Sequence, residues 1–149
     1  MNKREDMKQM IERLKQRGVT LTPQRMAVIE FLIKSSNHPC VDTIYQAIKK
    51  KYPSISPATV YSTLQLLKEM GEIQELHIRG DRACYDPITW RHHHLLCRSC
   101  GRILDVDIDG CPITNNKLIR EHRVEEVQAY IYGVCSECLE KERDDKSKS

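Results

Sequence analysis

The chain has 149 residues, of which 40% are hydrophobic and 5% aromatic, and its formal net charge is +3. This length allows one domain or two small ones, and two small domains with so few aromatic residues would each have a modest core. No apolar run reaches membrane-spanning length. The charged first residues lead us to expect no signal peptide, a cytoplasmic location and reduced cysteines.

Positive charge is concentrated in the first half of the chain. Residues 1–86 hold fourteen Lys and Arg against ten Asp and Glu, a net charge of +4, whereas residues 87–149 hold ten against eleven, a net charge of −1. A surface that contacts DNA phosphates would therefore lie in the first half.

The first half has the pattern of four helices and a hairpin. We expect helices over residues 3–17, from Pro23 to the break at Asn37-His38-Pro39, over about 41–51 and from Ser56 to about Met70, and then strands at 73–78 and 83–86. Thr22 and Ser56 are each followed by proline, which suits an N-cap followed by the first helical residue.

This order of elements predicts a winged helix-turn-helix over residues 1–86, in which the fourth helix enters the major groove of DNA. The alternative is an ordinary small helical domain with a polar outer face. The positions opposite the apolar stripe of the fourth helix would face the groove, and they are Ser56, Ala58, Thr59, Tyr61, Ser62 and Gln65.

The second half has the pattern of a small mixed sheet, so we expect an α+β protein with a dimerisation and metal-binding domain over residues 87–140. We expect strands at 103–108 and 127–132, a turn at 109–112 and a short helix at 113–122. Residues 141–149 are a run of charges with Ser and Lys, which predicts a flexible solvated tail.

Two C-x2-C pairs predict a structural zinc site. Cys97 and Cys100 form the first pair, and Cys135 and Cys138 form the second. Two residues between cysteines allow one turn to direct both thiolates at one ion, and two such turns complete the closed tetrahedral shell of structural zinc. Disulfides, a catalytic dithiol and an iron–sulfur cluster remain alternatives. The other cysteines, Cys40, Cys84 and Cys111, are expected to be free thiols.

A second metal site is suggested by His92 and His94, whose side chains share one side of an extended segment. Asp86 and Asp105 lie in neighbouring elements. Nitrogen and carboxylate ligands without a thiolate suit Fe(II), Mn(II), Co(II) or Zn(II) at moderate affinity. The alternatives are a polar surface segment or a different shell for the same zinc.

Several motifs, in order along the chain, resemble the ferric uptake regulator (Fur) family. They are Thr22-Pro23-Gln24-Arg25, Asn37-His38-Pro39, Ser56-Pro57-Ala58-Thr59-Val60-Tyr61, His92-x-His94-x-x-Cys97-x-x-Cys100-Gly101 and Tyr132-Gly133-x-Cys135-x-x-Cys138. The resemblance implies a dimeric, metal-dependent DNA-binding repressor, with Arg25 among the DNA contacts. It also implies a regulatory metal bound by His38, Asp86, His92, His94 and Asp105.

Within that family, the combination of three His and two Asp resembles the peroxide-sensing branch, PerR. The resemblance implies that bound Fe(II) reacts with peroxide and that His38 or His92 is oxidised, which releases DNA. A repressor that senses iron or zinc levels is one alternative. A zinc-dependent enzyme is another, although no additional acid, base or nucleophile motif supports it. An accessory interaction module is a third.

Overall fold

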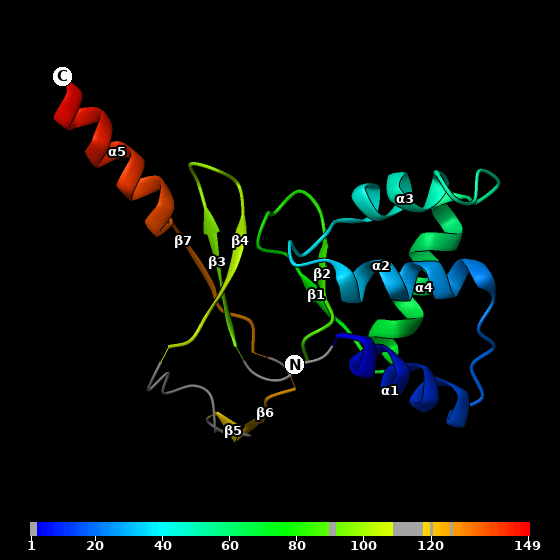
Figure 1. Ribbon diagram of the computed structural model, residues 1–149. Helices are drawn as coiled ribbons and strands as arrows, with labels where there is room; N and C mark the ends of the chain where they lie inside the picture. Colours follow the sequence, from blue (N-terminus) through cyan, green and yellow to red (C-terminus); the bar gives the residue numbers. More distant parts are fainter. Residues whose placement is uncertain (1–2, 90–91, 109–117, 120, 126) are drawn as a thin grey trace. The chain divides into compact units, whose positions relative to one another are not determined.

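The computed structural model describes residues 3–89, 92–108, 118–119, 121–125 and 127–149. The chain divides into two compact units, residues 1–90 and 91–149. The first unit is mainly helical and the second contains the larger sheet (Figure 1). No helix in the described part of the chain combines the length and apolarity needed to span a membrane.

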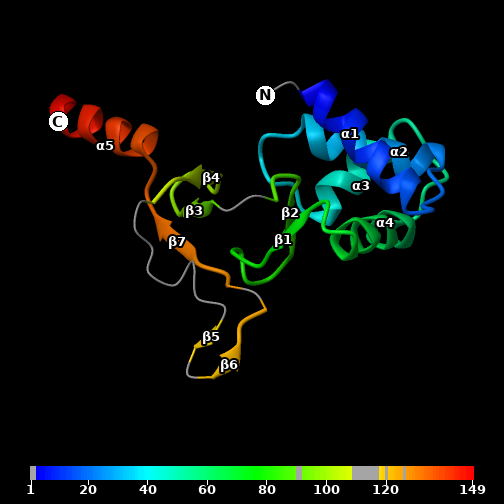
Figure 2. The ribbon, with the colours of Figure 1, turned by 90° about the horizontal axis from the view of Figure 1, so that it is seen from below.

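The first unit consists of four helices and a hairpin, as the sequence predicts. Its elements are α1 (Lys3–Gln16), α2 (Pro23–Lys34), α3 (Val41–Lys49), α4 (Pro57–Glu69), β1 (Gln74–Leu76) and β2 (Cys84–Asp86). The strands are shorter than predicted and pair antiparallel, with Gln74 opposite Asp86 and Leu76 opposite Cys84. Figure 2 shows the four helices gathered around one another with β1 and β2 beside them.

Side-chain caps define where α2 and α4 begin. Thr22 Oγ1 accepts a hydrogen bond from the backbone N–H of Arg25 at 3.3 Å. Ser56 Oγ accepts one from the backbone N–H of Thr59 at 3.1 Å. Each cap satisfies a donor that the first turn of a helix leaves without a partner, and the following proline has no N–H to satisfy. The predicted caps are confirmed.

One apolar core joins the helices to the hairpin. Its most deeply buried side chains are Leu14, Val28, Ile29, Leu32, Ile44, Val60, Leu64, Leu67 and Tyr85. At the edge of this core, Arg13 donates from Nε and Nη2 to the buried carboxylate of Glu72, at 2.9 and 2.7 Å. This charged contact attaches α1 to the residues that follow α4, where a lone buried carboxylate would be costly.

The second unit is built on a three-stranded sheet in the order β4-β3-β7. The central strand β3 (His93–Cys97) pairs antiparallel with β4 (Ile103–Val106) and parallel with β7 (Tyr130–Gly133). The predicted α+β class, with an N-terminal winged helix and a smaller sheet-containing part, is confirmed by this arrangement and by the solved structure compared with this chain below.

The helix predicted over residues 113–122 is wrong where the structure describes this segment. Strands β5 (Leu118–Ile119) and β6 (His122–Arg123) pair antiparallel there. Glu121 has φ +69, a left-handed conformation that reverses the chain and that a continuous right-handed helix cannot contain. Residues 113–117 and 120 of this segment and the turn predicted at 109–112 lie outside the described residues.

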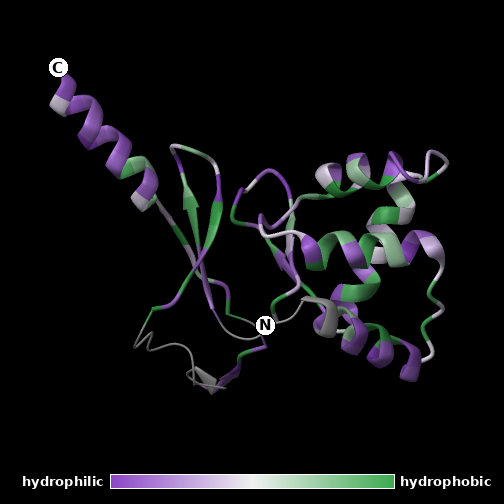
Figure 3. Cartoon of the chain, in the orientation of Figure 1, coloured by the Kyte–Doolittle hydropathy of each residue, from purple (hydrophilic) through white to green (hydrophobic). Residues whose placement is uncertain are grey.

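The charged C-terminal segment forms a helix, α5 (Ser136–Lys148), where we expected a flexible tail from residue 141. Its sequence has no Pro or Gly, and Glu137 in the first turn and Lys146 in the last suit the helix dipole. Figure 3 shows that α5 is hydrophilic along most of its length. Its residues after Cys138 are exposed, as expected of a solvated segment.

Candidate metal centres and nucleic-acid interface

The four paired cysteines gather at one end of the sheet in the second unit. Cys97 ends β3, Cys135 follows β7, and the parallel pairing of these strands places Cys97 opposite Gly133. Both C-x2-C turns therefore begin at the same end of the sheet, where β3 and β7 stop. All four sulfur atoms lie within 4.8 Å of one another. The sulfur of Cys97 lies 3.9 Å from that of Cys138, and the sulfur of Cys100 lies 3.8 Å from that of Cys135.

These distances fit a tetrahedral zinc site. Zinc–sulfur bonds of about 2.3 Å place the sulfur atoms of a regular tetrahedron about 3.8 Å apart. The backbone N–H groups of Cys100 and Cys135 donate to Cys97 Sγ at 3.4 and 3.3 Å. These hydrogen bonds lower the pKa of Cys97 to about 6 and so favour the thiolate that zinc requires.

Arg102 adds positive charge beside the cysteines. Its Nη2 lies 3.8 Å from Cys135 Sγ and 2.6 Å from Glu137 Oε2. Hydrogen bonds to Cys100 and Glu137 raise the pKa of Arg102, so it stays protonated. A shell of four thiolates carries excess negative charge around a divalent ion, and a neighbouring guanidinium offsets part of that charge. The C-x2-C spacing gave no indication of Arg102.

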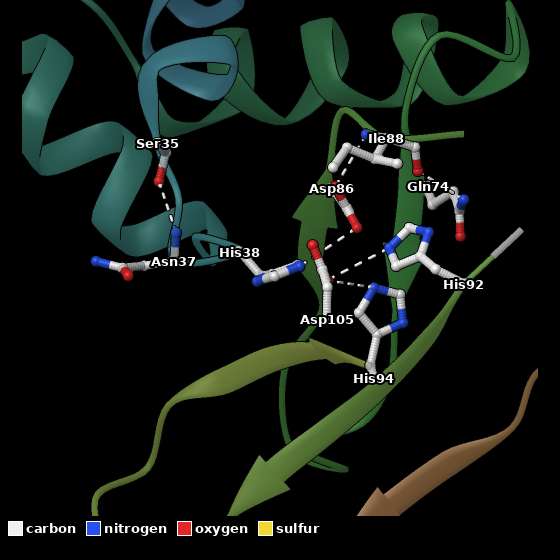
Figure 4. A network of polar contacts seen from close by, with 9 residues as sticks. All are labelled: Ser35, Asn37, His38, Gln74, Asp86, Ile88, His92, His94 and Asp105. Carbon is white, nitrogen blue, oxygen red and sulfur yellow. Dashed lines mark hydrogen bonds and ion pairs between the residues drawn. The ribbon is translucent and has the colours of Figure 1, made fainter. Parts of the chain in front are cut away.

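In the first unit, His38 and Asp86 form a buried pair (Figure 4). His38 Nε2 lies 3.3 Å from Asp86 Oδ2, and Asp86 Oδ1 accepts a hydrogen bond from the backbone N–H of Ile88 at 2.9 Å. His38 has φ +49, an uncommon conformation that turns the chain between α2 and α3. A turn residue and a strand residue are therefore held as one imidazole–carboxylate pair.

In the second unit, His92, His94 and Asp105 form a separate group of donors. Asp105 on β4 is opposite His94 on β3. Asp105 Oδ1 lies 3.4 Å from His92 Nε2 and 3.5 Å from His94 Nε2 (Figure 4). Both imidazoles thus reach one carboxylate, as the alternation of side chains in an extended segment predicts. Nitrogen and carboxylate donors of this kind suit Fe(II), Mn(II) and Zn(II).

Cys40 and Cys84 are joined by a disulfide, although the sequence led us to expect free thiols. The prediction is wrong for this pair because an isolated antiparallel bridge places Cys40 opposite Cys84, which is 44 residues later in the chain. Their spacing along the chain carries no sign of this pairing. Cys111 lies outside the described residues.

Helix α4 presents a polar face to solvent. Ser56, Ala58, Tyr61 and Ser62 are exposed, and Thr59 and Gln65 are half-buried. Tyr61 is 56% exposed, a large value for an aromatic side chain. Ser56 Oγ is already used by the N-cap, and Arg25 Nη1 donates to the backbone carbonyl of Thr20 at 2.7 Å. Tyr61 is therefore a large side chain of this face that extends into solvent.

Comparisons with known proteins agree with this geometry. The ferric uptake regulator family matches residues 16–132 of the chain. The chain belongs to the ferric uptake regulator family. The peroxide operon regulator of Bacillus subtilis is 39% identical over 145 residues, which cover 92% of this chain and 96% of that protein. The peroxide-responsive repressor PerR of Staphylococcus epidermidis is 37% identical, with 91% of each chain covered.

A solved structure also resembles this chain. The peroxide stress regulator of Campylobacter jejuni superposes with a TM-score of 0.63 at 33% identity, covering 86% of this chain and 98% of that one. The predicted resemblance to the family and to its PerR branch is confirmed by these relatives. The matched relatives are regulators, and the expectation that this chain is not an enzyme is confirmed in the same way.

Proposed function

We propose that this chain is a metal-dependent transcriptional repressor that responds to peroxide, acting in the cytoplasm as a homodimer on double-stranded operator DNA. The family match and the relatives named for peroxide response support this role. We assign residues 1–86 to DNA binding and residues 87–140 to dimerisation and metal binding. Zn(II) is the structural metal, and Fe(II) or Mn(II) is the regulatory one.

The observation that carries the proposal is the set of nitrogen and oxygen donors, without thiolates, that each unit contains. His38 and Asp86 are paired in one unit, and His92 and His94 converge on Asp105 in the other. Asp86 and His92 are six residues apart, so the chain between them spans at most about 21 Å. A connection of this length permits both groups to bind one shared ion.

A shared regulatory ion would explain how metal controls DNA binding. An ion held by His38, Asp86, His92, His94 and Asp105 has ligands in both units, so it favours one arrangement of the units over others. Repressor dimers need their recognition helices at the spacing of DNA half-sites. Metal binding and DNA binding must then promote each other, because coupling between two sites is reciprocal.

The exposed face of α4 is the proposed contact with DNA bases. Recognition helices contact base edges mainly through their N-terminal residues. In α4 these include Ala58, Thr59, Tyr61 and Ser62, with Ser56 at the cap. The family resemblance adds Arg25 on α2 to the proposed DNA contacts. The net positive charge of residues 1–86 supports phosphate contacts around this face.

Several features of the second unit support a homodimer. In the described part of this unit, few apolar side chains are buried besides the cysteines, and Ile108, Val127, Tyr132 and Leu139 are each at least 40% exposed. Strands β4 and β7 are the edges of the described sheet. A second copy would cover apolar surface and strand edges that a single unit leaves open.

The test loads the zinc-containing protein with Fe(II) or with Mn(II) and adds a small excess of hydrogen peroxide. When bound, Fe(II) supplies the electrons that reduce peroxide next to its own histidine ligands. We expect DNA binding to be lost only in the iron form, with a gain of one oxygen on the peptide that contains His38 or His92. DNA binding is measured by gel shift and the modification by mass spectrometry.

The manganese form is the matched control, because Mn(II) occupies the same ligands without this reaction. Unmodified histidines and unchanged DNA binding in the iron form would contradict peroxide sensing. They would leave a repressor that responds to metal concentration.

A further inference from the structure

The disulfide between Cys40 and Cys84 lies beside the His38–Asp86 pair in the first unit. Cys40 pairs with Cys84 across an antiparallel bridge, and the carbonyl of Pro39 accepts a hydrogen bond from the N–H of Tyr85 at 3.0 Å. The same antiparallel alignment places His38, two residues before Cys40, opposite Asp86, two residues after Cys84. The side chains of His38 and Asp86 are in contact.

The cysteines are therefore positioned to form and break a bond. Pro39 and Tyr85 form a hydrogen-bonded pair with a single bond, because Pro39 has no N–H. The next pair, Cys40 and Cys84, is a non-hydrogen-bonded pair, in which the two side chains lie closer together. The Cα atoms of Cys40 and Cys84 are 4.1 Å apart. Cys40 is half-buried and Cys84 is fully buried, so an oxidant reaches Cys40 first.

We propose that Cys40 and Cys84 are a reversible thiol–disulfide site that adjusts the metal affinity of the neighbouring His38–Asp86 pair. Disulfides in reducing compartments are usually transient and redox-sensing. The part of this proposal that concerns metal affinity rests on the regulatory site proposed above. The cysteine chemistry does not depend on it.

The oxidation needs two electrons and an oxidant such as a hydroperoxide. The Cys40 thiol attacks the peroxide O–O bond, giving a sulfenic acid and an alcohol or water. The Cys84 thiol then attacks the Cys40 sulfur, forming the S–S bond and releasing one water. A small dithiol, or two glutathione molecules, reverses the reaction by thiol–disulfide exchange and is itself oxidised to a disulfide.

The disulfide form is expected to bind Mn(II) more tightly than the dithiol form. The bond holds the turn that contains His38 against the strand that contains Asp86. His38 has a left-handed backbone, which persists only where its surroundings hold it in place. Two ligands held in place lose less conformational freedom when a metal binds, and preorganisation of this kind raises affinity.

The first experiment titrates full-length, zinc-containing protein in glutathione buffers of increasing oxidised fraction. Free thiols are alkylated, and a non-reducing digest is analysed by mass spectrometry. We expect a linked pair of peptides containing Cys40 and Cys84, lighter by two hydrogens than the separate peptides. The linked fraction rises with oxidised glutathione and falls again when reduced glutathione is restored, while the zinc content is unchanged.

Single-cysteine variants test whether Cys40 and Cys84 are the residues that form the disulfide. Cys111→Ser changes the one other cysteine that is not among the four candidate zinc ligands, and this variant should still give the linked peptides of Cys40 and Cys84. Cys40→Ser abolishes the linked pair and leaves Cys84 alkylated after denaturation. Cys84→Ala serves the same purpose if Cys40→Ser folds poorly, and circular dichroism and zinc content report folding in each case.

The second experiment measures the coupling to metal. We expect the disulfide form to bind Mn(II) about fivefold more tightly, near the lower end of typical coupling between sites. By reciprocity, saturating Mn(II) shifts the midpoint of the glutathione titration toward more reducing buffers. A fivefold effect corresponds to about 21 mV, at about 29.6 mV per tenfold change for two electrons.

The outcomes separate the two proposals. Absence of the linked peptides in every buffer overturns the thiol–disulfide site. Linked peptides with no effect of Mn(II) on the midpoint overturn the coupling, provided that His38→Ala still weakens Mn(II) binding. If His38→Ala leaves Mn(II) binding unchanged, the assignment of His38 to the regulatory site fails, while reversible linked peptides still establish the redox site.

Discussion

At the scale of single residues, the candidate zinc site of Cys97, Cys100, Cys135 and Cys138 includes backbone N–H donors as well as the four thiols. The N–H groups of Cys100 and Cys135 donate to Cys97 Sγ, and they lower the pKa of that thiol to about 6. Arg102 then places a positive charge within reach of Cys135. The hydrogen bonds to Cys97 thus stabilise the charged form of this thiol, which is the form that binds the ion.

We predict that Cys135→Ser removes the zinc and unfolds the second unit. Structural zinc contributes about 10–16 kcal/mol in small zinc-binding peptides at neutral pH, which is far more than the few buried apolar side chains here can replace. The zinc content measured by metal analysis should fall from one ion per chain toward none, and circular dichroism should show a loss of β-sheet.

The matched control is Cys111→Ser, which should retain zinc and dimerise normally in size-exclusion chromatography. A Cys135→Ser protein that remains folded and dimeric without zinc would show that the ion is not required for the fold.

At the scale of elements, α4 has one buried face and one exposed face. Val60, Thr63, Leu64 and Leu67 are buried in the core, whereas Ala58, Tyr61 and Ser62 are exposed. The hydroxyl of the buried Thr63 has a hydrogen-bond partner, because its Oγ1 donates to the carbonyl of Thr59 at 2.8 Å. The helix is therefore held by one face while the other remains exposed to solvent, as the proposed contact with DNA requires.

We predict that Tyr61→Ala reduces specific DNA binding while zinc content and dimerisation stay unchanged. A base contact is typically worth about 1–3 kcal/mol of discrimination, so affinity for operator DNA should fall by about tenfold or more relative to random DNA. Fluorescence anisotropy with both DNAs measures the ratio.

Gln16→Ala, a change to an exposed polar residue on α1, is the control and should bind both DNAs as the unchanged protein does. An equal loss by Tyr61→Ala on operator and random DNA would contradict a role for Tyr61 in reading bases.

At the scale of the whole molecule, the proposed regulatory site makes metal and DNA binding a single equilibrium. In the proposed site, one unit contributes His38 and Asp86 and the other contributes His92, His94 and Asp105. An ion that required all five ligands would select the arrangement of units that also binds DNA. The strength of regulation is then set by the difference in metal affinity between the arrangements.

We predict that Mn(II) tightens operator binding by about 5–150-fold, the range typical of coupled sites. Operator DNA should tighten Mn(II) binding by the same factor. Anisotropy at varied Mn(II) gives the first quantity, and Mn(II) titration with and without DNA gives the second.

Asp105→Ala should reduce both effects together while the zinc content stays at one per chain. A change in DNA affinity without a matching change in Mn(II) affinity would exclude this coupling.

The sequence alone determined the features that depend on short-range geometry. Thr22-Pro23 and Ser56-Pro57 predict helix starts because a cap and its helix are adjacent in the chain. The two C-x2-C motifs predict zinc knuckles because a single turn directs both sulfur atoms. His92 and His94 reach the same carboxylate because side chains in an extended segment alternate.

Only the tertiary structure decided which distant residues meet. The disulfide between Cys40 and Cys84 and the contact between His38 and Asp86 arise from one antiparallel bridge between segments far apart in the chain. Such pairings depend on how the helices pack, and a pattern within one segment contains no information about a partner in another.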